Sequence, residues 1–370
     1  VWAEGLPSKE QLNDLDAKEL DRFMSAIESF KNKIGSDGKP SFCIPLELSS
    51  QDPEFLALDD TTIQEYLTKE KYSGDFIYWY LNYCCKDDFG TSIKNVSAWA
   101  GLHYFAARNV KSNSHSGDVL TWPEGNYFLV KCLEKECKDK ILSNSLAYKI
   151  TKDGSLYNCH IFDVSKNESI IYKCKNLVLA TPQYVNKRLL GNSITVNWDE
   201  FNYYPWMVAN ISISDKEFLN GTNGILSWDN VMYNSNSLGY VNACHQSLNT
   251  MSKNTVLTYY CNFSEKDSKE ERKNIYEKDE NYWRAFIIDD LKIAHPNIEE
   301  YIESIEIQVW GHGMIAPEKG FKNSLLRKTL SEGVDNIHFI NSDVSGISIF
   351  EQAFYRGTEA AKKIIQIQNG

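Results

Sequence analysis

The stretch FINSDVSGISIFEQAFYRGTEAA, residues 339–361, decides the fold of this chain. Its pattern predicts a strand that ends at Asp343, a short turn at Gly346 and an amphipathic helix. Small residues such as Gly357 would let this helix lie close to a sheet. Such a turn sets backbone N–H groups beside a helix N-terminus, where an electron-rich or anionic group is favoured. An ordinary strand–helix unit gives the same pattern, so the spacing alone leaves both interpretations open.

The same stretch resembles the C-terminal FAD motif of flavin amine oxidases and phytoene desaturases. In that family an acidic residue after a strand holds the ribityl chain, and the next helix points its N-terminus at the flavin ring. The resemblance implies that Asp343, before the turn at Gly346, holds the ribityl chain, and that the backbone amide of Phe350 faces the flavin pyrimidine. Ser342 replaces the usual glycine, and Ile349 replaces an aromatic residue common in amine oxidases. An aromatic amine cage is therefore not implied.

Two further segments resemble the same family, in the same order along the chain. The segment CKNLVLATPQYVNKRLL, residues 174–190, is similar to the strand and turn that return to the FAD domain. Its residues expected to close over the dinucleotide are Ala180, Thr181 and Pro182. The segment VLTWPEGNYFLVKCL, residues 119–133, is similar to the turn that approaches the isoalloxazine ring and the substrate. The residues of this turn are Trp122, Pro123, Glu124, Gly125 and Asn126. Stretches such as NYCCKDDFGT further resemble an uncharacterised bacterial branch of FAD-dependent oxidoreductases.

Hydrophobic periodicity predicts a helical first third followed by strands. The predicted helices lie over residues 12–34, with a break, and over 61–68, 75–83 and 96–108. Alternating apolar residues from 141 onward predict an antiparallel meander of three strands that leads into a buried strand at 177–180. Further strands are predicted over 206–214, 239–244, 255–263 and 305–310, with a charged helical stretch over 269–294.

The resemblance implies an α/β, two-domain FAD-linked oxidoreductase fold. It would comprise an incomplete FAD-binding Rossmann-like domain and a substrate domain of mixed sheet plus helices. No linker interrupts the chain, so we expect the two domains to be interleaved. Residues 1–130 would form the mainly helical part of the substrate domain, and residues 191–335 its sheet and remaining helices. Residues 131–190 would supply the FAD-domain meander and strand, and residues 336–370 its last strand and helix.

Charge and cysteine content exclude several classes of partner. Lys and Arg number 39 against 50 Asp and Glu, so the net charge of −11 repels nucleic acid. No apolar run approaches the roughly 18 residues that span a bilayer, so no transmembrane segment is expected. The nine cysteines form no CxxC pair, which predicts reduced thiols, no metal site and a cytoplasmic location.

One glycine pattern formally matches a dinucleotide-binding fingerprint. Gly311, Gly313 and Ala316 fit G-x-G-x-x-G/A, but Pro317 and Gly320 interrupt the helix that the fingerprint requires. The first residue is Val and not Met, and no other glycine-rich turn joins a strand to a helix. We therefore expect a missing N-terminal segment that carries the phosphate-binding loop. Without it, this polypeptide should hold FAD poorly.

Histidine is the residue type best suited to move protons near neutral pH. His312 is the catalytic candidate, because glycine on both sides permits close approach to a cofactor or substrate. Taken singly, each histidine is more often structural than catalytic. Asp87 and Asp88 are adjacent, so their side chains should point apart, and we expect them in a solvated turn.

The expected function is FAD-dependent oxidation or dehydrogenation of a small organic molecule, by hydride transfer to the flavin. Two alternatives stay open. One is a non-redox flavoenzyme of the sugar mutase type. The other is an FAD-free fragment that serves as a binding module.

Overall fold

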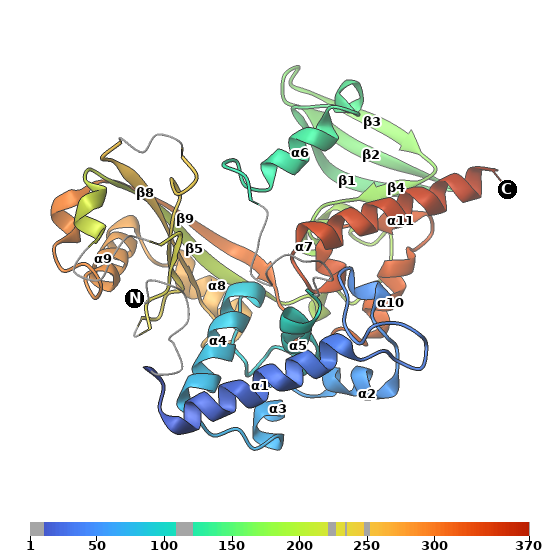
Figure 1. The fold of residues 1–370 in the computed structure, drawn as a ribbon. Helices are drawn as coiled ribbons and strands as arrows, with labels where there is room; N and C mark the ends of the chain where they lie inside the picture. Colours follow the sequence, from blue (N-terminus) through green and yellow to red (C-terminus); the bar gives the residue numbers. More distant parts are fainter. Residues whose placement is uncertain (1–10, 109–120, 221–226, 234, 248–251, 370) are drawn as a thin grey trace.

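The computed structural model describes residues 11–108, 121–220, 227–233, 235–247 and 252–369. Its elements form three groups (Figure 1): a layer of helices, a five-stranded sheet, and a meander beside a parallel strand pair and the C-terminal helix. Each group has its own cluster of buried apolar side chains. The chain is therefore built around several cores.

The helical group follows the predicted order. It contains α1 (Asp14–Asn32), α2 (Pro53–Leu56), α3 (Ile63–Lys69), α4 (Asp75–Phe89) and α5 (Ala98–Ala106), with the 3-10 turns η2 (Leu46–Leu48) and η3 (Ala57–Asp60). The predicted break in the first helix is wrong. Asn13 caps α1, and the buried side chains of Leu20, Phe23 and Ile27 recur on one continuous face. Because α1 contains neither Gly nor Pro, nothing local interrupts it.

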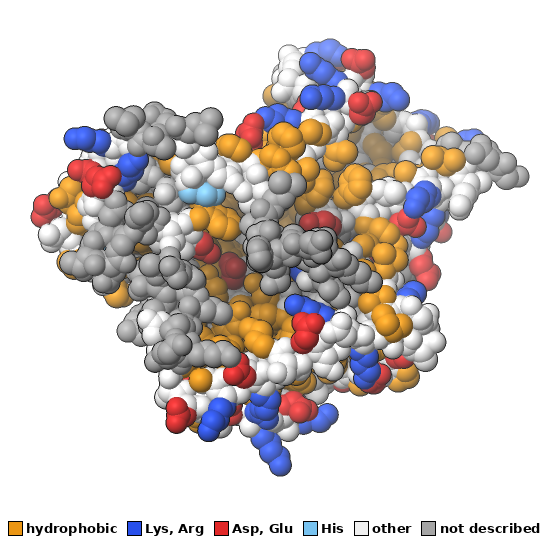
Figure 2. All heavy atoms as spheres, in the orientation of Figure 1, with side chains coloured by type: hydrophobic (Ala, Val, Ile, Leu, Met, Phe, Trp, Pro, Cys, Tyr) orange, Lys and Arg blue, Asp and Glu red, His pale blue; other side chains and the backbone are white. Residues whose placement is uncertain are grey.

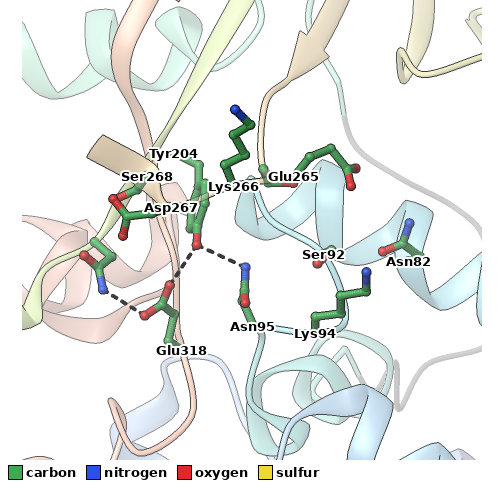
Figure 3. Close-up of a pocket in the computed structure, with 12 residues that line it drawn as sticks. Asn82, Ser92, Lys94, Asn95, Tyr204, Glu265, Lys266, Asp267, Ser268 and Glu318 are labelled. Atoms are coloured by element: carbon green, nitrogen blue, oxygen red, sulfur yellow. Dashed lines mark hydrogen bonds between the residues drawn. The ribbon is translucent and has the colours of Figure 1, made fainter. Parts of the chain in front are cut away.

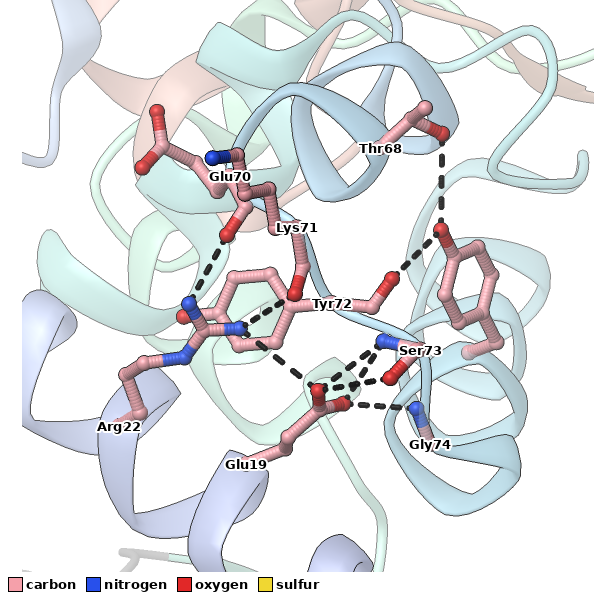
Figure 4. A network of polar contacts seen from close by, with 9 residues as sticks. Glu19, Arg22, Thr68, Glu70, Lys71, Tyr72, Ser73 and Gly74 are labelled. Atoms are coloured by element: carbon pink, nitrogen blue, oxygen red, sulfur yellow. Dashed lines mark hydrogen bonds and ion pairs between the residues drawn. The ribbon is translucent and has the colours of Figure 1, made fainter.

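Two acidic residues of α1 cap the N-terminus of α4. The Glu19 carboxylate accepts hydrogen bonds from the backbone N–H groups of Ser73 at 3.0 Å and Gly74 at 2.7 Å (Figure 4). Asp16 Oδ1 accepts from the Phe76 N–H at 3.0 Å. The first N–H groups of a helix have no partner within it, and a carboxylate also interacts favourably with the helix dipole. These contacts fix the angle between α1 and α4.

Arg22 secures the segment that leads into α4. Its guanidinium donates to the carbonyl oxygens of Glu70 at 2.8 Å and Lys71 at 3.1 Å, and lies 3.7 Å from the ring centroid of Tyr72 (Figure 4). Burial works to raise the pKa of Glu19, but the backbone hydrogen bonds and the charge of Arg22 together hold that pKa below its usual value.

The meander and the parallel pair adjoin the long C-terminal helix. The meander consists of β1 (Ser145–Asp153), β2 (Leu156–Asp163) and β3 (Glu168–Cys174), and β4 (Leu177–Leu179) pairs in parallel with β10 (Ile337–Phe339). The helices of this group are α6 (Tyr127–Glu134), α7 (Gln183–Leu190), α10 (Leu325–Glu332) and α11 (Phe350–Asn369), with the 3-10 turns η4 (Lys138–Lys140), η5 (Trp198–Glu200) and η8 (Ser342–Ser345). No helix in the described part of the chain is long and apolar enough to cross a membrane.

The five-stranded sheet has the strand order β6-β7-β8-β5-β9. Its strands are β5 (Tyr203–Ile213), β6 (Asp229–Asn230), β7 (Gly239–Asn242), β8 (Thr255–Asn262) and β9 (Ile302–Ile315). The associated helices are α8 (Ser268–Tyr276) and α9 (Glu280–Leu291), with the 3-10 turns η6 (Lys216–Asn220) and η7 (Ile298–Tyr301). The apolar side chains of α8 and α9 pack with those of the sheet in one core cluster.

The glycines of the formal fingerprint lie inside β9. The strand extends beyond the predicted residues 305–310 and runs through Gly311 and Gly313. A Cβ atom on Gly313 would lie 2.4 Å from the Trp206 ring, and one on Gly311 would lie 2.5 Å from the Tyr276 hydroxyl. These residues are glycine because aromatic side chains cover the strand there. The inference that they do not open a helix is confirmed.

We expect Glu19→Gln to lower the free energy of unfolding at pH 7 by about 1–3 kcal/mol, because it weakens charge-assisted bonds to a helix N-terminus. A lowered pKa means that this stabilisation is complete above the ordinary glutamate pKa of 4.5 and is lost as pH falls through the folded-state value. Urea unfolding of both proteins between pH 3 and 7 measures it. Glu28→Gln, at a mainly exposed side chain of the same helix, should change little. Equal losses for the two variants would disprove the capping role.

Candidate functional site

Asp343 lies where three parts of the chain meet. It belongs to η8, because β10 ends at Phe339, four residues earlier than predicted. The residue is only 6% exposed. Its Oδ2 accepts hydrogen bonds from the Tyr203 hydroxyl at 2.6 Å and from the Gln183 backbone N–H at 3.0 Å. One carboxylate thus joins the start of β5, the start of α7 and the turn before α11.

The carboxyl group of Asp343 and the side chain of Gln183 are both buried. Burial raises the pKa of Asp343, while the bonds from Tyr203 and Gln183 act in the opposite direction. Gln183 is fully buried, and its Nε2 has no hydrogen-bond partner among the described residues. The backbone N–H of Gln183 binds Asp343, whereas its side-chain oxygen accepts from Asn186 at 3.1 Å. A carboxyl with a perturbed pKa and a buried donor without a partner are both features that occur at functional sites.

The parallel pairing of β4 with β10 brings two of the predicted segments together. Asn341 Nδ2 donates to the carbonyl oxygen of Ala180 at 3.0 Å, and Asn341 Oδ1 accepts from the Asp343 N–H at 2.9 Å. Ala180 and Thr181 are exposed, and Pro182 stands at the N-cap of α7. The segment expected to close over a dinucleotide therefore lies directly beside Asp343.

The turn between Asp343 and α11 requires glycine. Gly346 has φ of 71°, and a Cβ atom there would lie 2.7 Å from the Phe321 ring. Ser342 is partly buried at the start of η8, and Ile349 packs partly buried against the helical core. Phe350 is the first residue of α11, so its amide lies at the helix N-terminus, as the sequence predicted.

The turn at residues 122–126 lies apart from this cluster. It precedes α6, of which no residue is buried. Trp122 stacks on Phe128 with ring centroids 4.9 Å apart, and Glu124 pairs with Lys131 at 2.8 Å. The other residues of the turn, Pro123, Gly125 and Asn126, are exposed. No contact described for this turn reaches Asp343, so its place beside a flavin stays a prediction.

His312 lies on the other side of Tyr203 from Asp343. Its ring stacks on Tyr184 at a centroid distance of 4.2 Å and meets the Tyr203 ring at 5.7 Å. Burial, followed by the charges of Arg272 and Arg188, lowers the pKa of His312 to about 4. The imidazole is therefore neutral at physiological pH, and it is a weak base.

Asp87 and Asp88 are not in a solvated turn, which corrects the sequence interpretation. Both lie in the last turn of α4 and are partly buried. Burial is the main cause that raises the pKa of Asp87 to about 7 and that of Asp88 to about 6. Asp88, Tyr104 and Ile349 line a small cavity next to the start of α11. In Figure 2, acidic side chains are visible among apolar ones deep in the recess between the sheet and the C-terminal group.

A larger polar cavity of about 430 Å³ lies where β5 meets the helical group (Figure 3). Glu318 accepts hydrogen bonds there from the Asn202 amide at 2.8 Å and the Tyr204 hydroxyl at 3.1 Å. Asn95 Nδ2 donates to the Tyr204 oxygen at 3.0 Å, and burial raises the pKa of Glu318. No local sequence pattern points to this carboxylate, because Tyr204 lies more than a hundred residues away from it along the chain.

We expect Gly346→Ala to destabilise the protein by about 2–4 kcal/mol, because it adds a clash with Phe321 to the strain of a positive φ. Gly154→Ala is the matched control. Gly154 also has a positive φ, of 61°, but its Cβ position is open, so only the strain of about 1–2 kcal/mol should appear. Urea unfolding measures both. Equal losses would show that the contact with Phe321 is unimportant.

The chain resembles known proteins in structure but not in sequence. No protein-family model matches the chain, and no curated protein matches its sequence. A single-residue variant of putrescine oxidase matches with a TM-score of 0.72 at 15% identity, over 96% of this chain and 76% of that one. Cyclohexylamine oxidase from Brevibacterium oxydans matches with 0.68 at 12% identity, over 97% and 77%.

An Exiguobacterium protein assigned as a protoporphyrinogen oxidase also matches, with a TM-score of 0.63 at 12% identity, over 98% of this chain and 77% of that one. Similarity at these identities establishes the fold alone. The chain therefore has the mixed α/β fold of these oxidases.

Proposed function

We propose that this chain belongs to an FAD-dependent oxidoreductase that oxidises a small organic molecule by hydride transfer to the flavin. The observation that carries the proposal is the unit formed by β10, Asp343 and the N-terminus of α11, with the Gln183 backbone N–H bonded to the carboxylate. When bound, FAD would supply the acceptor for the electron pair. The oxidase fold supports the proposal.

The residues present fit the polar part of such a cofactor. Asp343 would accept a hydrogen bond from the ribityl chain, and Gln183 Nε2 would donate one to a nearby oxygen. The Phe350 N–H, at the positive end of α11, would face the pyrimidine oxygen. Ala180 and Thr181 are exposed near Asp343, where a dinucleotide could cover them.

We propose that a glycine-rich strand–turn–helix, encoded ahead of Val1, completes the cofactor site. The support is the parallel pair itself. Parallel strands are normally buried on both faces, yet Val178 in the middle of β4 is 43% exposed. A further parallel strand would extend this pair, and the helix that follows it would cover the face on which Val178 is exposed. The codons upstream of Val1 provide the test, and an unrelated domain there would contradict it.

The carboxylates at the end of α4 favour a cationic substrate. Burial, followed by the charges of Asp88 and Asp229, raises the pKa of Asp87 to about 7, whereas Arg108 lines the small cavity with Asp88 and its charge opposes the rise in the pKa of Asp88. An ammonium group would give Asp87 a partner of opposite charge and lie beside Asp88. Putrescine oxidase and cyclohexylamine oxidase are named for amines. We therefore propose an amine-bearing substrate, held by these carboxylates without an aromatic residue at Ile349.

Two groups are proposed as proton acceptors. His312 is neutral and able to accept a proton, but it lies behind Tyr203 and has a low pKa of about 4. Asp88, with a pKa of about 6, lines the cavity at the start of α11. The pH dependence of turnover distinguishes them, because each group works only when deprotonated.

We expect Asp343→Asn to weaken FAD binding by about 1.5–3 kcal/mol in the full gene product, because a hydrogen bond to a charged group is lost. Flavin fluorescence during FAD titration measures the dissociation constant. Asp335→Asn, at an exposed carboxylate before β10, is the matched control and should bind FAD normally. Unchanged affinity in Asp343→Asn would remove the ribityl assignment. Absence of any flavin in the wild type would favour the binding-module alternative.

We expect Asp88→Asn to raise KM for an amine and to abolish a fall in KM as pH rises through about 6 to 7, where the wild-type carboxylates ionise.

If His312 is the base, His312→Gln should lower turnover by about 10²- to 10⁴-fold with FAD content unchanged. Stopped-flow bleaching of flavin absorbance measures reduction directly. Turnover of substrate without bleaching would favour the non-redox mutase alternative.

A further inference from the structure

We propose that the cavity between α7, α8 and β9 binds an oxyanion, a carboxylate or phosphate group, at a site separate from the proposed flavin site. The cavity measures about 300 Å³. The lining residues that carry the argument are Tyr184, Lys187, Arg188, Lys269, Arg272 and His312. The proposal does not rest on the presence of FAD.

Arg272 lines this cavity, and no carboxylate among the described residues forms an ion pair with it. Its Nε donates to the carbonyl oxygen of Gly311 at 2.7 Å, and its Nη2 donates to that of Tyr203 at 3.0 Å. The guanidinium is partly buried, and both described hydrogen-bond acceptors are neutral. Burial lowers the pKa of Arg272, and the neighbours that oppose this are Tyr276 and then Asp267, whose carboxylate already accepts from the Lys269 N–H at 2.9 Å. A charge withdrawn from water is stabilised when an anion reaches it.

Three further cations surround the cavity mouth. Lys187 and Arg188 extend from α7, and Lys269 extends from the first turn of α8. One carboxylate, Asp199, lines the same cavity and pairs with Lys187 at 3.4 Å. In a chain with a net charge of −11, four cations against one carboxylate form a local positive field. Arginine and lysine side chains converging on a concavity are the usual recognition elements for carboxylates and phosphates.

The pKa of His312 would report on the binding of an anion in this cavity. Its ring stacks on Tyr184 at the cavity wall, and both Arg272 and Arg188 contribute to its low pKa. The other titratable neighbours are Tyr203, whose ring meets it edge-on, and Tyr276, whose hydroxyl accepts from the adjacent Gly311 N–H. An anion between the arginines would offset their charge and therefore raise the pKa of His312.

Tyr203 separates this cavity from Asp343. Its hydroxyl donates to Asp343 Oδ2 at 2.6 Å on one side, and its ring faces His312 at 5.7 Å on the other. Tyr203 is only 4% exposed, and it lines the cavity. A ligand in the basic cavity would meet the Tyr203 ring, whereas a cofactor group at Asp343 would lie near its hydroxyl.

The test is calorimetric titration of the chain with inorganic phosphate and, separately, with acetate, at constant ionic strength set with chloride. We expect saturable binding of at least one anion, and the tighter one identifies the ligand class. Arg188→Gln should weaken it about tenfold or more, because one charge-assisted bond is lost. Arg188 is exposed, so this variant should fold normally. Lys131→Gln, at an exposed lysine of α6 outside the cavity, is the matched control and should bind like the wild type.

NMR titration of the His312 ring gives a second, independent readout. We expect its pKa to rise on addition of phosphate or acetate, and to rise without either anion in Arg188→Gln. Absence of saturable binding in the wild type, or equal affinity in Arg188→Gln, would overturn the proposal. Competitive displacement of phosphate by FAD would also overturn it, because the cavity would then belong to the cofactor site.

Discussion

The rest of the structure depends on one buried carboxylate, that of Asp343. Its Oδ2 accepts from Tyr203 at the start of β5 and from Gln183 at the start of α7, while its own N–H is held by Asn341. These short bonds link segments that are 140 and 160 residues apart in the sequence. Because the carboxylate is shielded from water, each bond is stronger than it would be at the surface, and loss of any partner leaves a buried group unsatisfied. The C-terminal turn, the parallel pair and the sheet are therefore positioned relative to one another by a single group.

A second set of polar contacts joins α11 to the helical group and so decides what faces the start of that helix. Arg356 pairs with Glu47 at 3.0 Å, and Gln352 accepts from the Leu46 N–H at 3.1 Å. Lys322 lies nearby against the Trp99 ring, and burial lowers its pKa to about 8. Removing one partner of such a buried pair would leave the other charge uncompensated. The last turn of α4 also lies next to the start of α11, because Asp88 and Ile349 line one small cavity.

Two environments of opposite character lie in different parts of the structure. At the end of α4, Asp87 and Asp88 are partly buried carboxylates whose pKa values burial raises. Behind Tyr203, Arg272 and the cations of α7 and α8 suit an anion. The acidic character of the chain as a whole predicts neither arrangement, because local charge is set by which helices the fold brings together.

The sequence by itself determined the local elements and one central residue. Helical periodicity predicted α1, α3, α4 and α5, and alternation predicted the meander and β4. These predictions were possible because the spacing of apolar residues within a short segment shows which of its faces is buried. The same local signals placed Asp343 and the helix after it beside each other. Only the tertiary structure decided that Tyr203 and Gln183 bind Asp343, that Asp87 and Asp88 are partly buried, and that Gly311 lies within a strand. These features depend on contacts between segments far apart in the chain, and no local spacing records which distant side chain will cover, neutralise or desolvate a given residue.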